Sequence, residues 1–286
     1  MMQPLRSTSC MAPNMDYISR AVIDYLARRL GKPIDFVIDL PWPERLRQLQ
    51  AGAIQMGWIC GAPYVERSAH PLSAPPLELL AAPVWRDPLY GDSPIYYSHL
   101  LVQRASAVQS FGDLRGQRWV YNDRGSLSGY HILRAYLWSL GEDDSFFAQQ
   151  IEAGSHQHAV QMVAEGQADV AAVDSTVLQQ MAQDEAEAGK AGAAATVRTL
   201  TLLGPNPMPP WVIGSGVPVA LRQAIRHWLI HMAQDATGAA ILAKTPIARF
   251  VAIEPQAYQP IAEILRQSRQ QLCSRDSDKV SAELLD

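Results

Sequence analysis

Residues 121–130 read YNDRGSLSGY and contain the groups best suited to bind an oxyanion. An apolar strand is expected to end at Tyr121, and a helix is expected to begin near Ser126 after a turn rich in Asn, Asp and Gly. The first N–H groups of a helix have no intrahelical acceptor and carry a partial positive charge, and nearby serine hydroxyls add further donors. Such a helix start is a site for a small oxyanion. The residues predicted to bind it are Ser126, Leu127, Ser128 and Gly129.

Alternative interpretations of this turn are structural. Ser126 can serve only as the helix cap, and Gly129 can serve only to allow close packing. The letters GSLSG approach the G-x-S-x-G pattern of esterases, but the central residue is Leu127, so an esterase nucleophile is excluded. Arg124 could add positive charge, although an exposed turn arginine is the simpler interpretation.

A second candidate segment is 152–158, EAGSHQH, where a strand is expected to end and a helix to begin. His156 falls in the first helical turn and can direct a ring N–H toward a ligand. A lone histidine is more often a surface residue, but the serine turn on the neighbouring strand favours a role for His156. A third candidate is Asp174, which ends the apolar strand ADVAAVD; it can bind a ligand or cap the following helix.

In the first part of the chain, Asn14 is expected to open a helix, and two aromatic residues follow strands. Trp42 comes after the strand at 34–38, and Tyr64 comes after the strand at 54–60. Aromatic rings at such positions can close over a ligand, while core or rim packing is the ordinary alternative.

Composition excludes several classes of protein. The 24 Lys and Arg against 28 Asp and Glu give a net charge of −4, and no basic stripe is present, so nucleic-acid binding is not expected. The three cysteines lack metal-binding spacing, so a cysteine metal site is not predicted. No other cofactor is predicted either. No apolar run approaches ~18 residues, so a transmembrane segment is not predicted.

The amino end, MMQPLRSTS, has one arginine and no following apolar run of the kind found in secretory signal peptides. Two alternatives follow. The protein is periplasmic if a signal peptide was trimmed, and cytoplasmic if Met1 is the true start.

The order of strands and helices predicts an α/β fold of two Rossmann-like lobes joined by two crossover strands. Lobe 1 is expected to comprise 1–100 and 211–270 with a parallel sheet, and lobe 2 to comprise 101–210. Residues 204–210, GPNPMPP, are expected to form a loop, because four of the seven are proline. The last residues, 271–286, are expected to form a polar C-terminal tail. The ligand site of such a body is expected between the lobes, at the carboxyl ends of strands.

The chain resembles the substrate-binding proteins of phosphate, phosphite and phosphonate ABC importers, which have the type II periplasmic-binding-protein architecture. The resemblance spans about 9–260, and its most specific parts are the Ser-x-Ser-Gly turn at 126–129 and the Gly-Ser-His at 154–156. It implies that the serines and His156 hold phosphonyl oxygens and that Trp42 and Tyr64 wall the site. The family's acidic residue in the second crossover loop is replaced by Pro209, so an aminophosphonate is not expected to be the best ligand.

The resemblance implies a non-catalytic receptor that hinges closed on a small phosphorus oxyanion and delivers it to an ABC permease. No nucleophile–base set is evident unless Asp174 orients His156, so catalysis is not expected. The alternative is a cytoplasmic enzyme or ligand sensor on the same bilobal fold, which the missing export signal would favour. The protein is expected to be a monomer.

Overall fold

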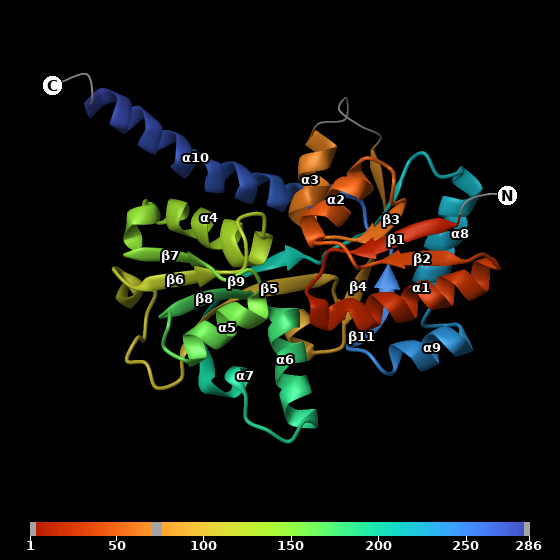
Figure 1. The fold of residues 1–286 in the computed structure, drawn as a ribbon, viewed down its shortest axis with the longest axis horizontal. Coiled ribbons are helices and arrows are strands. Elements are labelled where there is room, and N and C mark those ends of the chain that lie inside the picture. The colour runs from red at the N-terminus through yellow and green to blue at the C-terminus, as the bar shows by residue number, and fades with distance from the viewer. Residues whose placement is uncertain (1–3, 70–75, 283–286) are drawn as a thin grey trace. The chain divides into compact units, whose positions relative to one another are not determined.

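The computed structural model describes residues 4–69 and 76–282, with side chains up to 270. The chain divides into two compact units, each discontinuous in sequence (Figure 1). The first comprises Met1–Ile95 and Pro207–Gln259, and the second comprises Tyr96–Asn206 and Pro260–Asp286. Each unit packs helices on its own sheet, as an α/β lobe requires.

The first unit is built on a six-stranded sheet in the order β11-β4-β10-β3-β1-β2. Its strands are β1 (Leu5–Ser9), β2 (Ile34–Val37), β3 (Met56–Trp58), β4 (Leu77–Trp85), β10 (Trp211–Gly214) and β11 (Ile247–Val251). β1 is parallel to β2 and β3, but β10 runs antiparallel to β3 and β4, and β11 runs antiparallel to β4. The prediction of a purely parallel sheet is therefore wrong. β10 returns from the second unit in the opposite direction, and the short strand β11 was not predicted.

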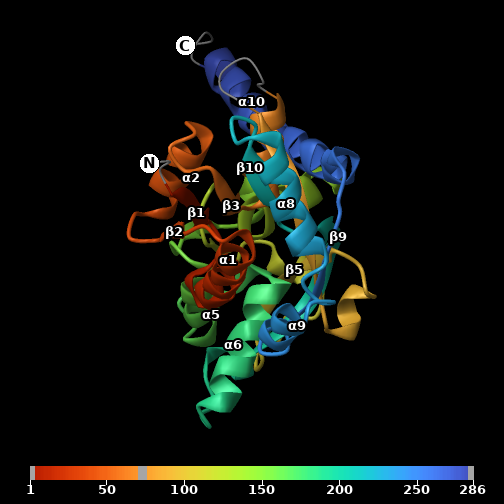
Figure 2. The same ribbon diagram turned by 90° about the vertical axis from the view of Figure 1, so that its right-hand side faces the viewer.

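Amphipathic helices cover this sheet. They are α1 (Asp16–Leu30), α2 (Trp42–Gln50), α3 (Gly61–Ala69), α8 (Val219–Ile230) and α9 (Ala236–Leu242). α1 packs against β2, α8 and α9 (Figure 2), and it buries Ile18, Val22 and Leu26 at helical spacing. Gly31 ends α1 in the left-handed conformation, with a φ of 61°, which costs little only for glycine.

The second unit is built on a five-stranded sheet in the order β7-β6-β8-β5-β9. Its strands are β5 (Ile95–Gln103), β6 (Arg118–Tyr121), β7 (Gln149–Glu152), β8 (Val170–Asp174) and β9 (Val197–Pro207). β6 is parallel to β7 and β8, whereas β5 is antiparallel to β8. The predicted loop at 204–210 is wrong over its first four residues, because β9 continues to Pro207. β9 is an edge strand of this sheet, where a proline that cannot donate to a ladder is tolerated.

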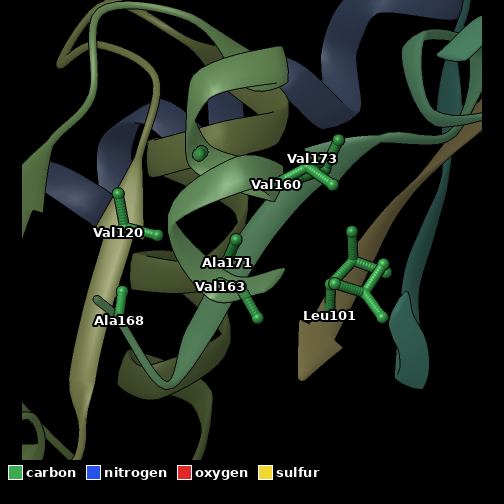
Figure 3. Packing of buried hydrophobic residues seen from close by; sticks show 9 residues of the cluster. Leu101, Val120, Val160, Val163, Ala168, Ala171 and Val173 are labelled. Carbon is green, nitrogen blue, oxygen red and sulfur yellow. The ribbon is translucent and has the colours of Figure 1, made fainter. Parts of the chain in front are cut away.

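The helices of the second unit are α4 (Ile132–Ser139), α5 (His156–Ala164), α6 (Ser175–Glu187), α7 (Ala193–Thr196) and α10 (Gln259–Ala282). Val160 and Val163 on α5 pack against Ala171 and Val173 of β8, and all four are fully buried (Figure 3). Burial of such side chains contributes roughly 1.5–3 kcal/mol each for valine-sized groups. This core fixes the first turn of α5, which carries His156.

The C-terminal helix differs from the prediction. Residues 211–270 were assigned to lobe 1, but the segment from Pro260 onward clusters with the second unit. There, Ser268 Oγ lies 2.9 Å from His131 Nδ1, and both side chains are buried. The predicted polar tail, 271–286, continues this helix through Ala282, and 283–286 lie outside the described residues. Within the described part of the chain, none of the helices combines the length and the apolar character needed to span a bilayer.

Candidate functional site

The serine turn follows β6 in the second unit. Ser126 is the N-cap of a π-helical turn, Leu127–His131, that continues into α4. Its Oγ accepts a hydrogen bond from the Gly129 N–H at 3.1 Å, so the capping role of Ser126 is confirmed. The hydroxyl hydrogen of Ser126 is still available to donate to a ligand. The N–H groups of Leu127 and Ser128 have no intrahelical acceptor within reach, because they lie in the first turn.

His156 meets this turn from the neighbouring strand–helix connection. β7 pairs with β6, and α5 begins directly at His156 with Ser155 as its N-cap. His156 Nε2 lies 3.1 Å from Ser128 Oγ. The backbone carbonyl of Ser128 accepts a 2.7 Å hydrogen bond from Ser98 Oγ, which holds the turn on β5. The structure therefore brings the predicted Ser128 and His156 into contact.

The other ring nitrogen of His156, Nδ1, is buried and has no hydrogen-bond partner among the described residues. His156 is only 8% exposed. A buried ring nitrogen without a partner costs free energy, so a polar group of a ligand is the natural complement.

Asn122, which the sequence argument did not select, completes the lining of this turn. Its Nδ2 donates to Asp123 at 2.8 Å, and its Oδ1 is buried without a partner among the described residues. An added Cβ on Gly129 would lie 1.9 Å from Asn122 Oδ1 and 3.1 Å from His156 Cε1. Glycine is thus required at 129 for Asn122 and His156 to approach the turn. The Asn directly after the apolar strand was the available sequence signal.

Burial sets the protonation states in this part of the molecule. It lowers the pKa of His156 to about 4, so the imidazole is neutral at pH 7. It raises the pKa of Asp174 to about 6, against hydrogen bonds from Thr176 that favour the carboxylate. The donors around the serine turn are therefore mainly uncharged: backbone N–H groups, hydroxyls and one neutral imidazole.

The free energy of unfolding is expected to fall on acidification from pH 7 to pH 5. Because folding lowers the pKa of His156 from 6.5 to about 4, the unfolded chain binds more protons in this range, and the stability present above pH 6.5 is progressively lost. The contribution of His156 is about 2 kcal/mol between these two pH values. Burial lowers the pKa of His99 and His131 in the same direction. The raised pKa of Asp174 acts oppositely, because its folded state gains protons as the pH falls.

Urea unfolding at pH 7 and pH 5 measures this dependence. His156→Gln should reduce the loss by about 2 kcal/mol relative to the parent. An unchanged pH dependence in that variant would show that His156 is not held neutral by burial.

Asp174 ends β8 and caps α6. Its Oδ1 accepts hydrogen bonds from the Thr176 N–H at 2.8 Å and from Thr176 Oγ1 at 2.7 Å, so the capping alternative is confirmed. In the sheet register Asp174 lies opposite Ser98, whose hydroxyl holds the serine turn. A direct contact of Asp174 with a ligand stays a prediction.

The first-unit candidates have different surroundings. Asn14 was expected to cap a helix, but its side chain makes no cap hydrogen bond, and that prediction is wrong. Its Nδ2 and Oδ1 are instead buried without partners among the described residues. Trp42 begins α2 and is half-buried. Tyr64 is buried in α3, with its ring 5.0 Å from that of Tyr258 in an edge-on contact. Ligand contacts of all three remain predictions.

Arg45 is a second residue that the sequence argument missed. It lies on α2, is 8% exposed, and donates through a terminal guanidinium nitrogen to the backbone carbonyl of Ser9 at the end of β1. The surrounding pattern WPERLRQLQ contains three charged residues, so periodicity alone did not distinguish the buried arginine from solvated ones.

A cavity of about 780 Å³ in the first unit lies away from these residues. It is lined at the amino end of β1 by Leu5 and Arg6, together with Leu49, Leu77 and Leu221. None of the predicted ligand-binding residues lines it, so the candidate site is defined by side-chain chemistry and not by this cavity.

Neither a metal site nor a catalytic triad is assembled in the described residues. No group of three His, Cys, Asp or Glu side chains there could hold a metal ion. Ser128 and His156 form a serine–histidine contact, but among the described residues no carboxylate bonds to His156 Nδ1 to orient the ring as a general base. The arrangement can bind an oxyanion through neutral donors.

Comparison with known proteins agrees with this chemistry. A family model described as "ABC transporter, phosphonate, periplasmic substrate-binding protein" matches residues 13–258. The chain belongs to this phosphonate-binding family. The family consists of transporter binding proteins, not enzymes, and its role is substrate binding.

Several solved structures share the fold of this chain, although their sequences are only about 15% identical to it. PhnD1 from Prochlorococcus marinus (MIT 9301), in complex with methylphosphonate, is 15% identical over 92% of this chain and 97% of its own, with a TM-score of 0.77. A binding protein component of an ABC phosphonate transporter from Pseudomonas aeruginosa is 16% identical over 99% and 100%, with a TM-score of 0.77. A Xanthomonas citri protein bound to ATP is 16% identical over 94% and 98%, with a TM-score of 0.71. The predicted type II periplasmic-binding-protein architecture is confirmed.

Proposed function

We propose that this protein captures a small phosphorus oxyanion, with a methyl- or other alkylphosphonate as the first candidate, at the serine turn and His156. The observation that carries the proposal is the 3.1 Å contact of Ser128 Oγ with His156 Nε2, which leaves the buried Nδ1 of the same ring without a partner among the described residues. A tetrahedral oxyanion supplies the acceptors that these donors need.

Neutral donors suit reversible capture of such an anion. A receptor has to release its cargo, and a micromolar dissociation constant corresponds to roughly −8 kcal/mol. Hydrogen bonds to a charged oxygen contribute about 1.5–3 kcal/mol each, so a few of them suffice after the cost of association is subtracted. The buried Oδ1 of Asn122 accepts a hydrogen bond from the protonated oxygen of a phosphonate monoanion.

Ligand choice within this class follows from the second crossover. The segment GPNPMPP offers Pro209, and no carboxylate occurs within it to pair with an amine. Methylphosphonate, phosphite and phosphate are therefore preferred over an aminophosphonate. Methylphosphonate is also the compound in the complex of the Prochlorococcus relative.

Delivery to an ABC permease in the periplasm follows from the family and is part of this proposal. The protein then acts as a monomeric carrier whose ligand leaves chemically unchanged. A hydrolytic role is the alternative that the contact of Ser128 with His156 would favour. Phosphorus NMR distinguishes the two, because turnover of a phosphonate or phosphate ester that disappears in Ser128→Ala would establish the alternative.

Methylphosphonate is expected to stabilise the protein by about 2.7 kcal/mol at one hundred times its dissociation constant. Replacing a donor to a charged oxygen removes about 1.5–3 kcal/mol, so His156→Ala should weaken binding roughly ten- to a hundredfold. Ser128→Ala should weaken binding in the same direction, because it removes the hydroxyl that donates to His156 Nε2 and so leaves the ring proton on Nδ1. Thermal unfolding and isothermal titration calorimetry measure both effects.

The matched control for this test is His158→Ala, since His158 is exposed and lies two residues along the same helix. It should bind like the parent. If phosphite, phosphate and methylphosphonate all fail to bind the parent, or if both site variants bind normally, the proposed function is wrong.

A further inference from the structure

The cavity of about 780 Å³ in the first unit has no role in the site at the serine turn. Its lining comes from the start of β1, the connection from α1 to β2, the residues that follow α2, and the connection from β10 to α8. The described residues that line it all belong to the first unit, so the cavity is a feature of that unit by itself. Pockets of roughly 300–1,000 Å³ are the size that small-molecule ligands occupy.

Aliphatic side chains form much of the wall of this cavity. Leu49, Leu77 and Val217 are buried, whereas Leu5 and Leu221 are half-buried. The half-buried leucines leave part of their apolar surface in water, and covering such surface is favourable in proportion to its area. The described lining contains no aromatic side chain on which a ring could stack, so an alkyl chain fits this wall better than a planar ring.

Two cations, Arg6 on β1 and Lys32 just before β2, line the same cavity, and no acidic residue is among the described lining. Arg6 donates through Nη1 to the Ala53 carbonyl at 3.0 Å. Asp35 is its cross-strand neighbour on β2, yet neither Arg6 nor Lys32 forms an ion pair with a carboxylate of the described residues. The cavity is therefore electropositive in a chain whose net charge is −4.

We propose that this cavity binds an anionic amphiphile, namely a monomeric medium-chain carboxylate, with its alkyl chain on the leucine wall and its head group at Arg6 and Lys32. A guanidinium has five donors and Arg6 uses one on Ala53, so donors remain for paired, charge-assisted hydrogen bonds to a planar carboxylate. Burial of the chain supplies most of the affinity, and the two cations supply the preference for an anion. This second binding site is separate from phosphonate capture and does not depend on it.

Calorimetric titration with decanoate, kept below its critical micelle concentration, tests the inference. The parent should bind one decanoate per chain. Octanoate and hexanoate should bind progressively more weakly, by roughly tenfold for each pair of methylenes removed, because each buried methylene contributes to the transfer free energy. Decanol has the same chain without the charge, and it should bind roughly tenfold more weakly than decanoate because it loses the charge-assisted hydrogen bonds.

Variants separate the head group from the chain. Arg6→Gln combined with Lys32→Gln should weaken decanoate roughly tenfold and leave decanol within about twofold of the parent. The matched control is Arg20→Gln combined with Lys244→Gln, which removes two exposed cations of the same unit outside the described lining and should bind decanoate like the parent. Leu221→Asn should weaken decanoate and decanol alike, because it makes the wall polar. Circular dichroism establishes that each variant is folded.

Competition distinguishes this cavity from the proposed phosphonate site. Methylphosphonate should bind the decanoate-saturated protein with unchanged affinity, since no residue of the serine turn lines the cavity. Displacement of one by the other would place the carboxylate at the phosphonate site and overturn the inference. So would failure of decanoate to bind, equal affinities for decanoate and decanol, or unchanged decanoate binding in the double variant at Arg6 and Lys32. Binding of phosphatidylglycerol vesicles without binding of monomeric decanoate would make this region a membrane-contact surface and would also overturn it.

Discussion

Replacing Gly129 by Ala is expected to weaken methylphosphonate binding roughly ten- to a hundredfold, because displacing His156 from the ligand removes a hydrogen bond to a charged oxygen that contributes about 1.5–3 kcal/mol. The new Cβ would lie 1.9 Å from Asn122 Oδ1, closer than non-bonded atoms allow, and 3.1 Å from His156 Cε1, a tight contact. Asn122 is buried and bonded to Asp123, so it cannot move without disturbing the turn. Titration calorimetry measures the loss.

The control for this substitution is Gly112→Ala in the same unit. There a Cβ would meet only Ser110 Oγ at 3.7 Å, an ordinary contact, so binding should be unchanged. Combining Gly129→Ala with Asn122→Ala removes the closest clash and should restore part of the affinity. Binding of the single variant within threefold of the parent would refute the steric requirement at Gly129.

Replacing Arg134 by Met is expected to lower the free energy of unfolding by about 3–5 kcal/mol, the usual cost of removing one member of a buried ion pair. Arg134 is fully buried on α4 and contacts both carboxylate oxygens of Asp144, at 3.0 and 3.1 Å. It also donates to the Tyr130 hydroxyl at 3.3 Å. The substitution leaves the buried Asp144 charge uncompensated. Urea unfolding followed by circular dichroism measures the change.

Two comparisons show whether burial causes this loss. Arg266→Met removes an ion pair with Glu263 in which both side chains are about half exposed, and such pairs contribute at most about 1 kcal/mol. Arg134→Met combined with Asp144→Leu should recover most of the stability, since replacing both partners with apolar groups is often neutral. If Arg134→Met alone is as stable as Arg266→Met, the ion pair of Arg134 with Asp144 does not stabilise the second unit.

Local signals in the sequence predicted the elements that carry the candidate site. The run RWVY, the turn NDRGS and the periodicity after Leu127 placed a strand, a cap and a helix start close to where the structure has them. A cap and a helix start depend on hydrogen bonds within a few residues, so the local sequence determines where they lie. The proposal that the serine turn binds an oxyanion rests on the same short segment.

Long-range packing decided the remaining features. β10 is antiparallel because the chain returns through it after the second unit, and α10 joins the second unit through contacts such as Ser268 with His131. Neither strand direction nor helix docking leaves a signal within a window of ten residues. The same reason explains why Tyr64, expected at a ligand, packs on Tyr258 nearly two hundred residues away.

The sequence by itself determined the α/β class, the serine turn and the position of His156 at a helix start, because these depend on local hydrogen bonding and apolar periodicity. Only the tertiary structure decided that His156 contacts Ser128, that Asn122 lies against Gly129, and that Arg45 is buried while Arg47 is exposed. Those relations depend on which strands pair and which helix face meets the sheet. Burial then sets the neutral state of His156 and leaves Arg45 without a paired anion, and both properties arise only once the chain is folded.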